Sequence, residues 1–135
     1  MRSAPCMLIM VLVSFLVAGC GSSRVKVSGR LTKGGVPYVP GNNEMVRLVF
    51  SPLDPQASES RGSYLANFNR EDGTFKVVGT DGKGIPPGQY RIAIRVLKNR
   101  KDLLKGAFEA KKSPFVREVT SSTKEISLDL ANPKE

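Results

Sequence analysis

The chain contains 135 residues, with 21 Lys and Arg against 12 Asp and Glu, a formal net charge of +9, and neither histidine nor tryptophan. This length suits a single domain with one core. The lack of histidine excludes the usual Ser-His-Asp and Cys-His nucleophilic sites and removes the commonest ligand of zinc and copper.

The N-terminal segment has the three parts of a secretory signal peptide. Arg2 supplies a basic start, residues 7–18 are apolar apart from Ser14, and Val17-Ala18-Gly19 offers small residues for cleavage. The apolar run is shorter than the about 20 residues that a helix needs to cross a bilayer. We therefore expect residues 1–19 to direct export and then to be removed.

The sequence Val17-Ala18-Gly19-Cys20 resembles the lipobox of bacterial lipoproteins. The resemblance implies cleavage before Cys20, acylation of its thiol with diacylglycerol, and a short membrane tether at residues 20–23. It implies a lipid-anchored position in the cell envelope, with the outer membrane favoured over the inner because Gly21, not aspartate, follows Cys20. Since Cys6 leaves with the signal, no intramolecular disulfide is expected. The alternative is an ordinary signal beside an unmodified cysteine.

From residue 24 on, apolar and polar residues alternate in short runs, a pattern typical of strands with one wet face. Gly34-Gly35 and Asp72-Gly73 are turn signals between such runs. Strands with one wet face pair antiparallel, so we predict an all-β, antiparallel two-sheet sandwich of about seven strands over residues 24–131, followed by a tail at 132–135. The expected strands are 25–31, 46–50, 64–68, 74–78, 89–96, 115–119 and 125–130.

One segment departs from the alternation. Leu103, Leu104, Ala107 and Phe108 recur at helical spacing after Asp102, a candidate N-cap, which predicts a short helix near residues 102–112. Gly106 weakens this helix. We expect Leu104 and Phe108 to cover an edge or an end of the sandwich.

The order of the strand segments carries a second resemblance. Asp72-Gly73-Thr74-Phe75, followed by Pro87-Gly88-Gln89-Tyr90-Arg91-Ile92, is similar to carboxypeptidase-regulatory-like, or transthyretin-like, domains, and together with the lipobox to small bacterial lipoproteins that carry such a domain. The connection at Gly34-Gly35-Val36-Pro37-Tyr38 departs from the family's compact first turn. The resemblance implies a fold and not a reaction. Transthyretin-like hydrolases use histidines and a C-terminal Tyr-Arg-Gly-Ser motif, which this chain lacks.

Candidate catalytic and metal-binding residues are few. Ser113 beside Lys111 and Lys112 is the one Ser-Lys combination we considered, and its basic surroundings favour a solvated loop. Asn69, Glu71 and Asp72, with Asp81, are the only acidic loop cluster, and their spacing fits a hairpin turn better than a calcium loop. We therefore expect no enzymatic activity, no metal and no cofactor.

The remaining chemical feature is positive charge along one stretch of the chain. Five residues are candidates for binding an anionic surface: Arg95, Lys98, Arg100, Lys101 and Lys105. The expected partner is anionic lipid or polysaccharide. Nucleic acid is not expected, because the compartment is wrong and no stacking aromatic residues are interleaved. A merely solvated face remains the simpler interpretation.

These observations predict a membrane-anchored, non-enzymatic envelope lipoprotein that acts as a structural or interaction module. The alternative is a carbohydrate- or peptide-binding accessory domain, which would need exposed aromatic residues. Tyr38 is expected in a loop, whereas Tyr64 and Tyr90 are better explained as core. A small envelope hydrolase would need an unrecognised Ser-Lys site.

Overall fold

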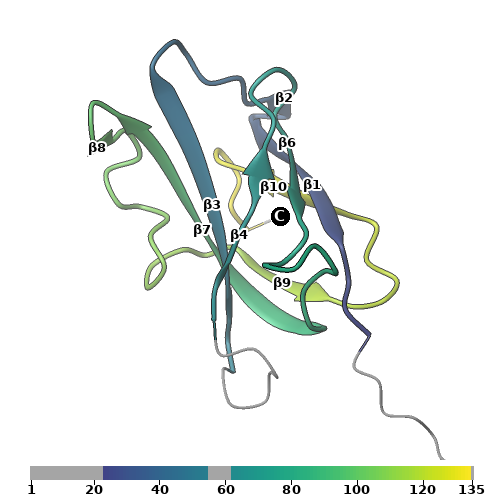
Figure 1. Ribbon diagram of the computed structural model, residues 1–135. Helices are drawn as coiled ribbons and strands as arrows, with labels where there is room; N and C mark the ends of the chain where they lie inside the picture. Colours follow the sequence, from purple (N-terminus) through teal and green to yellow (C-terminus); the bar gives the residue numbers. More distant parts are fainter. Residues whose placement is uncertain (1–22, 55–61, 135) are drawn as a thin grey trace, which may run out of the picture.

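The computed structural model describes residues 23–54 and 62–134, and within them it forms two five-stranded sheets packed face to face, with no helix (Figure 1). The predicted fold class, an all-β two-sheet sandwich, is confirmed. The described residues form ten strands where about seven were expected, because four pairings involve strands of only two residues.

The first sheet has the order β10-β1-β6-β5, with β2 also paired to β1. Its strands are β1 (Val27–Lys33), β2 (Val36–Pro37), β5 (Asn67–Phe68), β6 (Thr74–Val77) and β10 (Glu125–Asp129). β10 runs parallel to β1, which differs from the antiparallel pairing expected throughout, because the chain reaches β10 from the opposite sheet and not through a hairpin. The predicted Gly34-Gly35 turn joins β1 to β2 with φ angles of 63° and 80°.

The second sheet has the order β4-β3-β7-β8, with β9 also paired to β7. Its strands are β3 (Glu44–Pro52), β4 (Tyr64–Leu65), β7 (Gly88–Lys98), β8 (Lys101–Asp102) and β9 (Val116–Val119). β3 and β7 are antiparallel partners along the whole of β3, from Glu44 opposite Lys98 to Pro52 opposite Tyr90. This long ladder fixes which outward side chains face each other.

The expected strand at 64–68 is divided between the two sheets. Tyr64–Leu65 pairs with β3, and Asn67–Phe68 pairs with β6. Ala66 lies at the crossing point, where it is buried and its amide donates to the Leu48 carbonyl. The chain thus passes from one sheet to the other without a loop and closes one side of the sandwich.

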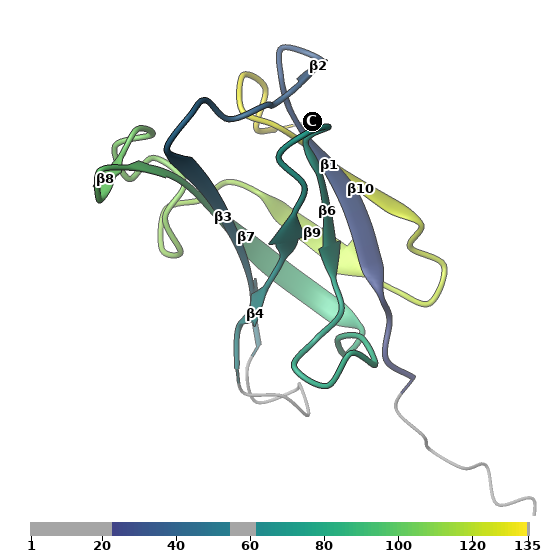
Figure 2. The same ribbon diagram turned by 45° about the horizontal axis from the view of Figure 1, so that its top comes forward.

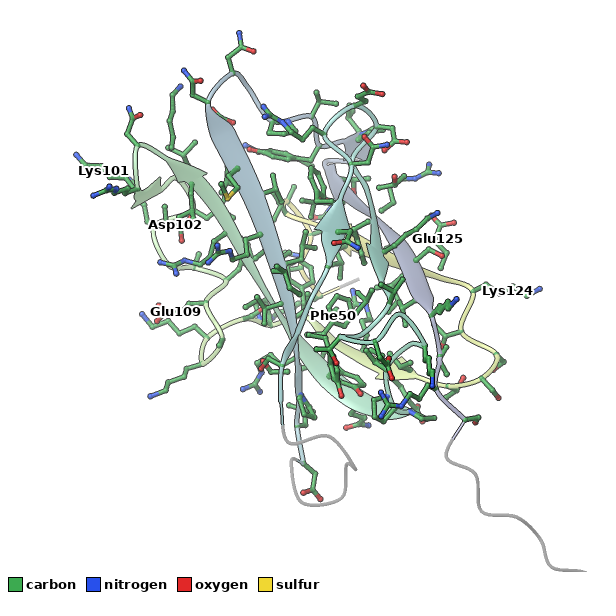
Figure 3. All side chains as sticks on the ribbon, in the orientation of Figure 1. Phe50, Lys101, Asp102, Glu109, Lys124 and Glu125 are labelled. Carbon is green, nitrogen blue, oxygen red and sulfur yellow. The ribbon has the colours of Figure 1, made fainter. Side chains whose placement is uncertain are left out.

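The core lies between the sheets and is centred on aromatic rings. Phe50, on β3, lies 6.0 Å from Phe75 of the other sheet and 6.3 Å from Tyr90, between ring centroids (Figure 3). The Tyr90 hydroxyl donates to the Pro86 carbonyl at 2.6 Å. Burial raises the pKa of Tyr90 to about 12. The assignment of Tyr64 and Tyr90 to the core is confirmed, with 4% and 1% of their surface exposed.

The predicted helix near residues 102–112 is wrong, because the segment forms a series of turns. The Asp102 carboxylate accepts hydrogen bonds from the amides of Leu104 and Gly106, as an N-cap would. Lys105 and Gly106 then have positive φ angles of 54° and 74°, which a right-handed helix does not allow. Phe108 still covers the edge of β7, because its carbonyl accepts from Ile94 and its ring lies 5.4 Å from Phe115.

Candidate functional site

The five predicted cationic residues fall into two places. Arg95 projects from the outer face of β7, whereas Lys98 ends that strand. Arg100, Lys101 and Lys105 belong to the β7–β8 turn, to β8 and to the turns that follow. Lys101 and Asp102 mark the tip of the β7–β8 hairpin in Figure 3. The candidate residues therefore do not form one continuous stripe.

Two of the five cations are already paired. Lys98 Nζ lies 3.7 Å from Glu44 Oε1, and Arg95 Nε lies 3.9 Å from Asp102 Oδ2. Among the described residues, Arg100, Lys101 and Lys105 form no ion pair. The hairpin tip thus exposes positive charge that no carboxylate in the described part of the chain offsets.

The turn at this tip has an unusual residue. Asn99 and Arg100 have φ angles of 50° and 66°, both in the left-handed region. Two-residue hairpin turns of this kind normally place glycine second, because a bulky side chain is disfavoured at positive φ. Here the second position is an exposed arginine. The tip therefore places Arg100, an exposed cation, in a backbone conformation that is unfavourable for a bulky residue.

A stronger constellation lies on the outer face of the β3–β7 ladder. Arg47 is the direct cross-strand partner of Arg95, and the next outward pair is Val49 opposite Ala93. Like charges directly opposite one another on a sheet are destabilising. Arg47 forms no ion pair within the described residues. Two arginines thus stand side by side at one end of a small apolar floor.

This floor is the base of an open hollow of ≈590 Å³, which we call the basic hollow. At the end opposite the arginines lie Ser51 and Ser63, whose hydroxyl oxygens are 2.8 Å apart. Residues 109–111 contribute to its lining from the turns that follow β8. The basic hollow therefore combines three cationic side chains, the third being Lys111, with two hydroxyl groups.

One acid also lines the basic hollow. Glu109 forms an ion pair with Lys112, at 3.4 Å between Oε1 and Nζ. The Glu109 label in Figure 3 marks the turns that lie beside β7. Because Lys112 offsets this carboxylate and Asp102 is paired with Arg95, the net positive charge of the hollow comes from Arg47 and Lys111. Guanidinium groups and hydroxyls are the donors that bind carboxylate and phosphate.

Sequence reasoning identified Arg95 but missed Arg47 and the hollow. Alternation placed Arg47 on the outer face of its strand, but no local signal says which strand lies beside it. Lys111 belongs to the same stretch of positive charge but was not among the five predicted binding residues. The missing information is the register that sets Arg47 opposite Arg95.

In the basic loop expected around Ser113, Lys111 and Lys112 are exposed, but Ser113 itself is only 3% exposed. Its hydroxyl donates to the Ile92 carbonyl and accepts from the Phe115 amide at 3.3 Å. The first of these bonds attaches the segment to β7. The Ser113 hydroxyl thus has a structural role.

The acidic cluster at residues 69–72 shapes a turn. Asn69 Oδ1 accepts from the Glu71 amide at 2.9 Å, and Asp72 Oδ1 accepts from the Thr74 hydroxyl at 2.6 Å and from its amide at 3.0 Å. These bonds from Thr74 lower the pKa of Asp72. In the part of the chain that the structure describes, no three acidic, histidine or cysteine side chains come together as a metal site would require.

The chain enters the sandwich at the end farthest from the β7–β8 tip. Val25 and Ile85 exchange two backbone hydrogen bonds of 2.8 Å, and Ile85 lies just before β7 begins at Gly88. β7 then runs 11 residues to Lys98, a length of roughly 33 Å. Figures 1 and 2 show the N-terminal end of the described chain and β8 on opposite sides of the molecule. Cys20 itself lies outside the described residues.

Among the described residues there is no helix long and apolar enough to cross a membrane. Comparisons of the chain with protein-family models, with curated proteins and with solved structures give no match.

Proposed function

We propose that this protein is a membrane-anchored, non-enzymatic lipoprotein of the bacterial envelope that acts as an interaction module for an anionic partner. Acyl chains on Cys20 hold it to the membrane, with the outer membrane favoured. Its sandwich is of the carboxypeptidase-regulatory-like, transthyretin-like type. The observation that carries the proposal is the position of the β7–β8 tip: the chain enters the domain at one end, and Arg100, Lys101 and Lys105, which form no ion pair within the described residues, lie at the other.

In this arrangement the anchor orients the domain as well as locating it. The β7–β8 tip lies roughly 33 Å along β7 from the point where the chain enters, so an anchored domain standing upright presents Arg100 and Lys101 away from the membrane. Exposed cations at such a distance attract anionic groups of other envelope components. Multiple acyl chains hold a protein at a bilayer without help from basic residues, which leaves the cations free for a partner.

The alternative function, a module for neutral carbohydrate or peptide, has less support. Such sites rely on exposed aromatic rings. Within the described residues every aromatic side chain is buried or half-buried, including Tyr38 and Phe68. The outer faces offer arginine, lysine and serine instead, which favours an anionic ligand.

Mass spectrometry of the native N-terminus, combined with membrane fractionation, tests the anchor. We expect the wild-type protein to begin at Cys20 with an added acyl mass and to sediment with membranes. Cys20→Ala should carry no acyl mass and should not be cut before residue 20. Cys6→Ala is the matched control, because it removes the other cysteine and should be processed and acylated like the wild type. A wild-type N-terminus without acyl mass would refute the anchor.

A further inference from the structure

The basic hollow carries an inference about the ligand. We propose that it binds an acidic sugar unit, bearing a carboxylate or a phosphate, of an envelope polysaccharide. The proposal rests on the proposed function for the presence of such a chain within reach. The binding chemistry itself rests on Arg47, Arg95 and Lys111.

The first argument is the arginine pair. Arg47 and Arg95 are direct cross-strand partners, so their Cβ atoms are about 4.5–5.5 Å apart. Both side chains leave the same face of the sheet, and both line the hollow. An acidic group between two guanidinium groups receives charge-assisted hydrogen bonds from each and removes their mutual repulsion. The ion pair of Arg95 with Asp102 joins Nε to Oδ2, at 3.9 Å.

The second argument is the shape and composition of the site. Its volume of ≈590 Å³ lies within the about 300–1,000 Å³ of ordinary small-ligand sites. Val49 and Ala93 supply a flat apolar floor, and Ser51 and Ser63 supply hydroxyl groups at the far end. A charged sugar presents this combination, with an acidic group at one end and hydroxyl groups at the other.

The same features weigh against other anions. No aromatic ring lines the hollow, so nucleic acid bases have nothing on which to stack. A flat bilayer surface first meets the residues that protrude most, and Arg47 and Arg95 lie along the β3–β7 ladder and not at the hairpin tip. The protruding β7–β8 tip, not the hollow, is the part suited to a flat charged surface.

Calorimetry on the full chain in a nonionic detergent tests the proposal. The probes are oligogalacturonate, which carries carboxylates, poly(glycerol phosphate), which carries phosphates, and a neutral maltooligosaccharide. We expect at least one acidic probe to bind and the neutral probe not to bind. Arg47→Gln and Lys111→Gln should each weaken binding about tenfold, the effect of losing one charge-assisted hydrogen bond.

Lys33→Gln and Lys76→Gln are the matched controls, because they remove the same charge from exposed positions on the other sheet, outside the hollow. They should weaken binding less than about twofold at moderate salt. Thermal melts should show all four variants folded.

Two results would overturn the proposal. Equal weakening by the hollow and control variants would indicate general charge attraction. Arg47-dependent binding to phosphatidylglycerol vesicles, without binding of either acidic probe, would assign the site to lipid. Because the protein is solubilised in detergent, neither result depends on acylation of Cys20, which the N-terminal mass tests separately.

Discussion

The outer faces of the two sheets differ in what lies beside their arginine side chains. On the β10-β1-β6-β5 sheet, Arg30 lies opposite Ser127 and Thr74, and its Nε is 3.7 Å from Glu125 Oε1. On the β4-β3-β7-β8 sheet, Arg47 lies directly opposite Arg95. On the first face Arg30 is paired by the chain itself, whereas on the second Arg47 has no ion pair within the described residues and keeps a repulsion with Arg95 that an anion would relieve.

The two sheets also differ in where they place a small residue. Beside the arginine pair, the second sheet has the small residue Ala93 facing outward, and the basic hollow opens above it. The first sheet places its small residue inward, where Gly29 lets the Phe75 ring lie against β1. One sheet therefore uses its small residue for packing and the other for space at the surface. Variants can test whether these two uses are separate.

The largest effect is expected from filling the inward space of the first sheet. In Gly29→Ala, the new Cβ would lie 2.3 Å from Phe75 Cζ and 2.4 Å from the Ile126 carbonyl oxygen. Overpacking of this kind typically lowers the free energy of unfolding by about 1–3 kcal/mol. Urea denaturation measures the change.

Gly62→Ala is the matched control, since no atom lies within 4 Å of its added Cβ. It should change stability by less than about 0.5 kcal/mol. Folded Gly29→Ala should still bind the acidic probes at the second sheet. Equal losses of stability in the two alanine variants would contradict the packing role of Gly29.

A smaller effect is expected from Asp129, which connects the first sheet to its turn. Its Oδ1 accepts from the Gly34 amide at 2.9 Å, and its Oδ2 accepts from the Gly35 amide at 2.7 Å. The bond from Gly34, with those from Ala131 and Gly35, lowers the pKa of Asp129 from 3.8 to about 2. The stabilisation is therefore present above about pH 4 and is lost as the pH falls through about 2.

In Asp129→Asn, one of these acceptors becomes an amide donor that faces a backbone N–H. The melting temperature at pH 7 should be lower than that of the wild type, and the difference should shrink between pH 4 and pH 2. Glu71→Gln, whose carboxylate accepts no hydrogen bond in the described part of the chain, should melt like the wild type at every pH. A deficit of Asp129→Asn that persists unchanged at pH 2 would contradict this role.

The comparison of the two sheets also shows what the sequence could reveal. The inward faces at Leu48–Phe50, Tyr90–Val96 and Ile126–Leu128 were predicted, because alternation is a local property of a half-buried strand. The helix near 102–112 failed because its spacing is helical, while positive φ at Lys105 and Gly106 breaks the segment into turns.

Features that depend on partners distant in sequence were not predictable. Tyr64, Ala66 and Phe68 lie at alternate positions, as in a single continuous strand, so nothing local reveals the change of sheet at Ala66. Likewise, Arg47 and Arg95 are 48 positions apart, and only the β3–β7 register makes them neighbours. The candidate site therefore could not be predicted from the pattern of any single strand.

Charge reversal should have the smallest effect on stability. It should also distinguish most directly between the charge environments of the two outer faces. Arg47→Glu places a carboxylate opposite Arg95, which should raise the free energy of unfolding by about 0.2–1 kcal/mol. Arg30→Glu places a carboxylate beside Glu125 and should lower it by a similar amount. Both variants change the net charge equally, so their difference reports the local neighbours.

Urea denaturation at 10 mM and 1 M NaCl measures these changes, which should shrink at high salt because the screening length falls from about 30 Å to about 3 Å. The free energy of unfolding of Arg47→Gln should lie between those of the wild type and Arg47→Glu. A loss of stability in Arg47→Glu would mean that the arginine pair is not repulsive. A gain in stability together with loss of acidic-probe binding would instead show that the second sheet gives up stability to keep an anion site, as binding sites commonly do.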